Sequence, residues 1–201
     1  MVSGSGRRHG HRRGAHRPGE SRRSAADHLP GRPAPDAAPA AARRRLPWGT
    51  PSTIDYVEGA DAGYRWFAAK GHVPMFAFGH GLSYTRFEHR DLVVRGGDTI
   101  TAGFTVVNTG DRAGADVPQL YLTAMPGKPC LRLLGFERVE LSPGESRHVT
   151  IDADPRLLAH YDGSIRSWRI AAGSHTVALG ISATTLRSTA TVELTARTFG
   201  R

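Results

Sequence analysis

The chain has 201 residues and a formal net charge of +9, a length that suffices for one domain with a hydrophobic core plus a tail. The charge is concentrated in residues 1–50, which hold eleven arginines against three acids, whereas residues 51–201 are nearly neutral. The single cysteine, Cys130, excludes an internal disulfide and a cysteine-rich metal site. No apolar run is long enough to predict a membrane-spanning helix.

Residues 1–47 are rich in Arg, Gly, Ala and Pro and contain no aromatic residue. Such a segment buries too little apolar surface to offset the entropy of ordering it, so we expect it to be disordered. Its paired arginines are not followed by the apolar stretch of a signal peptide. No aromatic residues are interleaved with them, as they are in many nucleic-acid binders. We therefore expect no signal peptide and no nucleic-acid binding. GC-rich DNA translated out of frame has the same bias, so this origin stays open.

Aromatic residues begin at Trp48, and the segment 48–90 is dense in them. Residues 60–70 are compatible with a short helix, although the glycines around them also favour turns. The stretch "PMFAFGHGLSYTRFEH" then follows, from Pro74 to His89. We expect Gly79 and Gly81 to allow tight turns there, and the aromatic rings around them to provide packing surface.

After residue 90 the hydrophobic pattern has a period of two, which is typical of β-strands. Ile100, Ala102, Phe104 and Val106 share one predicted face, and further alternating runs are separated by Gly, Pro and Asn turns. These runs predict six or seven short strands and an all-β sandwich of the immunoglobulin or fibronectin type III kind. Asp154 followed by Pro155 predicts one capped helical turn, and Pro118 predicts an edge position or a bulge.

No motif for a nucleophile, a phosphate loop or a zinc protease occurs in the chain. Glu58 and Asp61 resemble a glycosidase carboxylate pair, whose members lie roughly 5–10 Å apart, but acids in a glycine-rich loop more often cap turns. Asp152, Asp154 and Asp162 fit strand-end and capping roles. We therefore assign no catalytic and no cofactor-binding residue.

The histidines are not spaced like metal ligands, so we assign no metal-binding residue. Those near the N-terminus lie in the segment expected to be disordered (His9, His11 and His16), and the others are expected at the surface or in caps (His72, His80, His89, His148, His160 and His175). Cys130 is expected to be a partly buried apolar residue or a loop thiol.

The segment "YVEGADAGYRWFAAKGHVPMFAFGHGLSYTRFEHRDL" resembles the end of the second catalytic-region domain of glycoside hydrolase family 3, which includes β-glucosidases and β-xylosidases. The shared pattern includes the run from Phe78 to Thr85, "FGHGLSYT". The following motifs, "VVNTGDRAGADVPQLYL", "LLGFERVELSPGESRHVTI" and "GSHTVALGIS", are similar to the fibronectin type III-like domain of that family. The sequence departs from the pattern at Ala77 and Pro118. The resemblance covers residues 54–195.

This resemblance implies that residues 48–90 are a remnant of an α/β sandwich domain with its linker, and that residues 91–196 form the fibronectin type III-like domain. The family is retaining, with an aspartate nucleophile in a (β/α)8 barrel and a glutamate acid/base upstream of the quoted pattern. Neither region matches this sequence, so no catalytic residue is carried over and we expect no hydrolysis by this chain alone. The aromatic residues of 54–89 are expected to form an exposed apolar patch.

Three functions follow from this comparison. The first is an accessory part of a β-glucosidase-like hydrolase, whose partner is the catalytic domains. The second is a stand-alone module that binds carbohydrate or protein, and the third is a subunit of a separately encoded glycosidase chain. We expect no cofactor and no membrane partner.

Overall fold

The computed structural model describes residues 55–200, so the predicted disorder of residues 1–47 lies outside the described part of the chain. The described residues form two helices and twelve strands. These are α1 (Tyr64–Lys70), β1 (Phe87–Arg95), β2 (Thr101–Asn108), β3 (Gly114–Asp116), β4 (Gln119–Met125), β5 (Lys128–Phe136), β6 (Val139–Leu141), β7 (Ser146–Asp152), α2 (Pro155–Leu158), β8 (His160–Asp162), β9 (Ser167–Ile170), β10 (Gly173–Ser182), β11 (Thr185–Leu194) and β12 (Arg197–Phe199).

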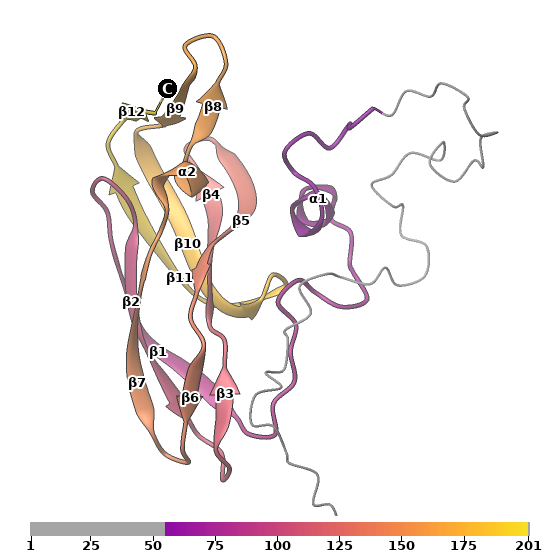
Figure 1. Cartoon of the computed structure of the whole chain (residues 1–201), viewed down its shortest axis with the longest axis vertical. Helices are drawn as coiled ribbons and strands as arrows, with labels where there is room; N and C mark the ends of the chain where they lie inside the picture. The colour runs from indigo at the N-terminus through magenta and orange to yellow at the C-terminus, as the bar shows by residue number, and fades with distance from the viewer. Residues whose placement is uncertain (1–54, 201) are drawn as a thin grey trace, which may run out of the picture.

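Two larger antiparallel sheets form the sandwich (Figure 1). One has the strand order β1-β2-β7, and the other has the order β11-β10-β4-β5. Two small sheets, β12-β9-β8 and β3-β6, extend its ends. The predicted all-β sandwich is therefore confirmed, although short strands such as β3, β8 and β12 were not predicted individually.

The alternating pattern of β2 places its apolar residues in the core. Ile100, Ala102, Phe104 and Val106 are fully buried, while the residues between them are only half-buried. They belong to one cluster with residues of the facing sheet, including Leu120, Leu122, Val177 and Leu179. A period of two therefore selects one inward face on each strand, as the sequence predicts.

Strand β4 departs from this alternation, because four consecutive residues at its start are buried. Leu120 and Leu122 belong to the core cluster, so Gln119 and Tyr121 lie on the opposite face of the strand. That outer face is covered by the chain that precedes β1. Proline 118 lies between β3 and β4, where the chain passes from one sheet to another, and not within a strand.

Both predicted helical turns are present. Gly71 ends α1 in the left-handed conformation with φ 66°, which a glycine adopts without steric cost. Asp154 caps α2, since its carboxylate accepts a hydrogen bond from the backbone N–H of Arg156 at 2.8 Å. Neither helix of residues 55–200 is long and apolar enough to cross a membrane.

The expectation that all folded histidines lie at the surface or in caps is wrong for two of them. His175 is fully buried, because it has the same strand parity as Val177 and Leu179, which face the core. The His89 side chain is only 2% exposed, and its Nε2 lies 2.6 Å from Oδ2 of Asp116. A buried histidine follows the strand alternation like any other residue when a neighbour satisfies one ring nitrogen.

Candidate functional site

The segment 55–86 lies outside the sandwich, and its helix α1 lies beside β5 (Figure 1). Tyr64 of α1 fixes it there. Its ring stacks on Phe78 with centroids 4.4 Å apart, and it meets Tyr121 edge to face at 6.2 Å. Its hydroxyl oxygen accepts a hydrogen bond from the backbone N–H of Leu133 at 2.9 Å. Since β5 is an edge strand, this bond satisfies an edge donor that would otherwise be open.

The buried side-chain amide of Gln119 makes a second connection between the segment 55–86 and the sandwich. Nε2 of Gln119 donates to the carbonyl oxygens of Gly79 at 3.1 Å and Ile181 at 3.0 Å. Its Oε1 accepts from the Tyr121 hydroxyl at 2.5 Å, and burial raises the pKa of Tyr121. Gly79 has φ 80°, so the predicted need for glycine is confirmed there. Gly81 has no positive φ, and a side chain there would meet open space.

A third connection ties the segment to the start of β1. The Thr85 hydroxyl donates to Oδ1 of Asn108 at 2.7 Å, and the backbone N–H of Gly110 donates to the same oxygen at 3.1 Å. Asn108 is fully buried, and its Nδ2 donates to the carbonyl oxygens of Arg112 and Leu141. The Asn108 side chain therefore makes four hydrogen bonds, which join the turn 108–112 to Thr85 before β1 and to Leu141 of β6.

Several large apolar side chains of this segment are exposed. We call them the apolar strip, and they are Tyr56, Val57, Val73, Met75, Phe76, Leu82 and Tyr84, with exposed fractions from 40% to 84%. The predicted exposure is found for Tyr56, Phe76 and Tyr84, but not for Phe67, which is buried, or for Phe78, which stacks on Tyr64. That the exposed side chains form one patch stays a prediction. All seven lie between residues 56 and 84 of the sequence, and large apolar side chains that gather on a surface mark interaction sites.

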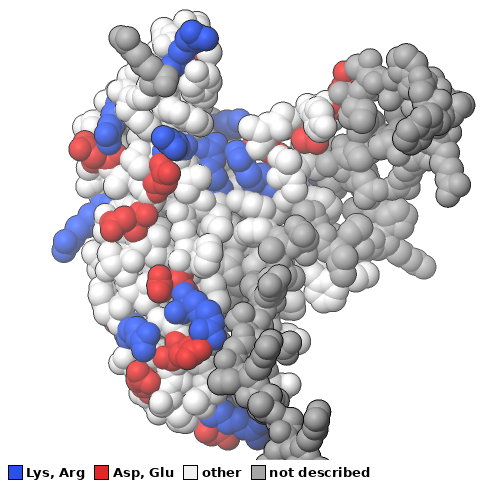
Figure 2. All heavy atoms as spheres, viewed as in Figure 1, with Lys and Arg blue, Asp and Glu red and all other residues white. Residues whose placement is uncertain are grey.

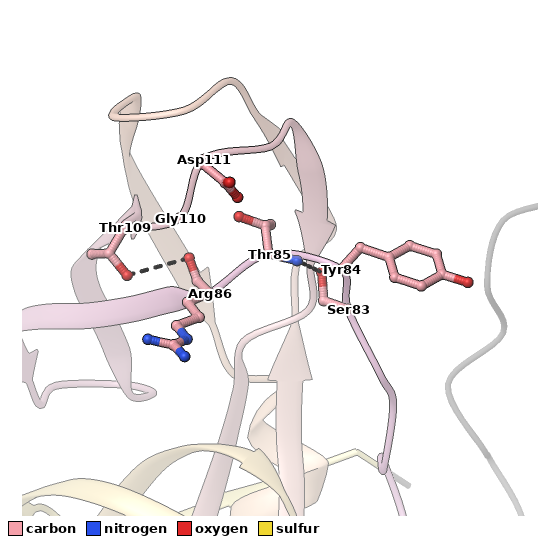
Figure 3. Close-up of a pocket in the computed structure, with 7 residues that line it drawn as sticks. All are labelled: Ser83, Tyr84, Thr85, Arg86, Thr109, Gly110 and Asp111. Carbon is pink, nitrogen blue, oxygen red and sulfur yellow. Dashed lines mark hydrogen bonds between the residues drawn. The ribbon is translucent and has the colours of Figure 1, made fainter.

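An open hollow of 440 Å³ lies at the end of the strip (Figure 3). Its lining comes from Ser83, Tyr84, Thr85, Arg86, Thr109, Gly110 and Asp111. The Tyr84 ring points away from the other residues, whereas the Asp111 carboxylate points toward Thr85 (Figure 3). The hollow offers hydroxyl groups, one acid and one guanidinium, which suit hydrogen bonding to a polar ligand. Its lining holds a single carboxylate, so it has no pair for glycoside hydrolysis.

The two acids weighed as a glycosidase pair occupy the turn before α1. Asp61 is committed to an ion pair with Arg65, whose Nη2 lies 2.6 Å from its Oδ1. Oε2 of Glu58 is buried without a hydrogen-bond partner. The assignment of no catalytic residue stays a prediction.

The acids expected at strand ends have such contacts. Asp152 accepts from the Thr101 hydroxyl at 2.6 Å. Asp162 accepts from the backbone N–H of Ser164 at 3.0 Å and from its hydroxyl at 2.6 Å. The Ser164 hydroxyl and Arg169 lower the pKa of Asp162 to about 2.

The remaining candidate ligands are dispersed. Cys130 is half-buried and its Sγ lies 3.7 Å from the carbonyl oxygen of Leu122, and burial raises the pKa of its thiol. Residues 55–200 contain no cluster of three or more His, Cys, Asp or Glu side chains that could hold a metal ion.

Sequence reasoning missed Gln119 and Asn108, which anchor the segment. For Gln119 the available signal was its parity with Tyr121 on a strand whose other face is apolar. Asn108 precedes Thr109 and Gly110, and an N-T-G sequence by itself indicates only a turn.

The fold defines an immunoglobulin-like sandwich protein, and residues 116–183 match the family model of the fibronectin type III-like domain. The chain is 38% identical over 142 residues to the thermostable β-glucosidase B of Acetivibrio thermocellus, a match that covers 67% of this chain and 19% of that protein. It is 36% identical over 157 residues to an exo-α-(1→6)-L-arabinopyranosidase of Bifidobacterium longum, covering 74% of this chain and 20% of that protein.

A solved structure agrees with these relatives. β-Glucosidase 3B of Thermotoga neapolitana, in complex with glucose, superposes with a TM-score of 0.68 at 35% identity, over 74% of this chain and 21% of that one. The chain corresponds to the fibronectin type III-like region of glycoside hydrolase family 3 β-glucosidase-like proteins, as the sequence predicts. It spans about one fifth of the length of these relatives. The boundaries 48–90 and 91–196 stay predictions.

Proposed function

We propose that this chain is the C-terminal accessory part of a family 3 glycoside hydrolase that acts on O-glycosyl bonds, and that it has no hydrolytic activity alone. The apolar strip carries this proposal. It lies on a segment whose other residues are fixed to the sandwich by Tyr64, Gln119 and Asn108. An ordered segment with exposed large apolar side chains suits a packing surface for another domain.

The partner in this proposal is the catalytic part of such an enzyme, either in one polypeptide or as a separate glycosidase chain. The accessory part contributes stability and interdomain packing to it. No nucleic acid and no membrane takes part. Both versions predict the same contact surface, because the strip is the same in each.

A complementation assay tests the proposal. The probe is β-glucosidase 3B of Thermotoga neapolitana from which the region matching this chain has been deleted. We expect its aryl β-glucosidase activity to rise when the purified chain is added, and the chain alone to be inactive. The excised region of that enzyme serves as the positive control. Hydrolysis by the chain alone, or rescue only by the positive control, would contradict the proposal.

A second candidate function is a stand-alone module that binds carbohydrate, and the hollow beside Thr85 favours it. The hollow combines hydroxyl groups, Arg86 and Asp111, which are the kinds of groups that hydrogen-bond to sugar hydroxyls. Retention of the chain on an insoluble β-glucan column, lost in Asp111→Ala, would support this function. Equal elution of both proteins would argue against it.

A further inference from the structure

The junction of α1 and β5 carries two arginines from separate elements. Tyr64 of α1 bonds to Leu133 of β5, so the residues beside them in sequence, Arg65 and Arg132, are brought to the same edge of the sheet. Figure 2 shows Lys and Arg atoms gathered where β5 and α1 lie in Figure 1. Both arginines are half-buried, so their charged groups are only partly solvated by water.

Arg132 uses only one part of its guanidinium. Its Nη1 donates to the carbonyl oxygens of Leu157 at 2.7 Å and Ala159 at 3.0 Å. Its Nε is buried and has no hydrogen-bond partner. Within residues 55–200 no acidic side chain forms an ion pair with Arg132. Burial and, after it, the neighbouring Arg65 lower the pKa of Arg132, the direction expected where the charged form is partly desolvated.

The unused edge has a definite chemistry. In a guanidinium, Nε–H and one terminal N–H point the same way and match the two oxygens of a carboxylate. Nε of Arg65 is buried without a partner as well, although its Nη2 pairs with Asp61. A buried charged donor without an acceptor is costly, so these atoms indicate a missing acceptor.

We propose that Arg132, beside Arg65, binds a carboxylate through its free edge, and that this carboxylate is an Asp or Glu side chain of the catalytic part of the enzyme. This inference rests on the proposed docking function. Two arginines stand against one acid that pairs with them, Asp61, so an acidic partner would complement the charge of the site. Helix α1, which carries Arg65, belongs to the same segment, 55–86, as the apolar strip.

Acetate is the probe for the carboxylate site, with the full chain as the protein. The measurement is the ¹H–¹⁵N resonance of arginine Nε–H while sodium acetate replaces sodium chloride at constant ionic strength. Loss of a peak in Arg132→Lys assigns the Arg132 resonance. We expect a saturable shift at Arg132 and none at the exposed Arg187. Equal shifts at both arginines, or a shift that does not saturate, would overturn the site. If the Glu58 carboxylate already occupies the free edge of Arg132, acetate will give no saturable shift, and the proposal is overturned in that case as well.

The complementation assay tests where the carboxylate comes from. Arg132→Gln should raise the chain concentration needed for half-maximal rescue about tenfold or more, because it removes a charge-assisted pair. Arg132→Lys should rescue little, since lysine lacks the planar edge. Lys128→Gln removes an exposed charge from the same strand. It should change the chain concentration needed for half-maximal rescue about twofold or less.

The outcomes distinguish failure of the carboxylate inference from failure of the proposed accessory function. If Arg132→Gln and Lys128→Gln behave alike, docking stands but the partner supplies no carboxylate, and the inference is wrong. If the wild-type chain does not rescue activity at all, the proposed function fails and the source of the carboxylate fails with it. Saturable acetate binding at Arg132 would then still establish the anion site itself.

Discussion

Tyr64 of α1 and Tyr121 of β4 meet edge to face, with ring centroids 6.2 Å apart. Tyr121 lies on the outer face of the sandwich, yet its exposed fraction is 0%. The segment 55–86 therefore covers the outer face of the sandwich at Tyr121 and also carries the exposed side chains of the apolar strip. One segment thus packs on the sandwich with one set of side chains and exposes another set, for which we propose a docking role.

Removing the Tyr64 ring should destabilise the whole sandwich. We expect Tyr64→Ala to lower the free energy of unfolding by about 2–3 kcal/mol, because a half-buried aromatic ring and its stacking are lost. Tyr64→Phe keeps the ring and removes only the bond to Leu133, so it should cost about 1 kcal/mol. Urea denaturation followed by tryptophan fluorescence measures both, and equal losses in the two variants would contradict the role of the ring.

Gly79 and Gly81 differ sharply in what they tolerate. A Cβ on Gly79 would collide with the amide of Gln119, and its φ of 80° is unfavourable for other residues. We expect Gly79→Ala to cost about 2–4 kcal/mol through strain and the broken amide bonds. Gly81→Ala is the matched control and should change stability by less than about 0.5 kcal/mol. Similar thermal midpoints for both variants would show that the amide contact is unimportant.

Substitution of Asn108 should lower the free energy of unfolding more than substitution of most other polar residues. Asn108→Ala removes two donated and two accepted hydrogen bonds and leaves buried groups unpaired. We expect a loss of about 3 kcal/mol. Thr85→Val removes only one of these bonds and should cost about 1 kcal/mol. Chemical denaturation compares them, and a loss in Asn108→Ala no larger than in Thr85→Val would contradict the role of the four hydrogen bonds.

Asp162 should make a small contribution to the folding stability of the chain, and this contribution should be lost in acid. Its pKa is lowered from 3.8 to about 2, first by the Ser164 hydroxyl and then by Arg169. Because the folded pKa is below the unfolded value, the stabilisation is present above pH 4 and is lost as the pH falls toward 2. The carboxyl ¹³C titration should move back toward its ordinary midpoint in Ser164→Ala. An unchanged midpoint would exclude the hydroxyl as the main cause.

The sandwich was predictable from the sequence because one-sided burial imposes a period of two. Ile100 to Val106 shows this without interruption. Asp154 and Pro155 were equally clear, since capping depends on adjacent residues only. The resemblance to glycoside hydrolase family 3 rested on a run of neighbouring residues, and the comparisons confirm it.

The contacts that fix the segment were not predictable, because they join residues far apart in the chain. Gln119 and Gly79 are separated by 40 positions, and no local pattern links them. The buried ring of His89 contacts Asp116, 27 residues away in the sequence. The Arg65 and Arg132 site arises only when α1 packs on β5.

The most direct test of the docking surface compares strip variants in the complementation assay. Leu82 is 78% exposed on the strip, and Ile165 is 51% exposed between β8 and β9, outside the strip. We predict that Phe76→Ser combined with Leu82→Ser weakens the rescue of aryl β-glucosidase activity at least about tenfold, while Ile165→Ser leaves it unchanged. Full rescue by the strip variant, or equal loss in the control, would contradict the account.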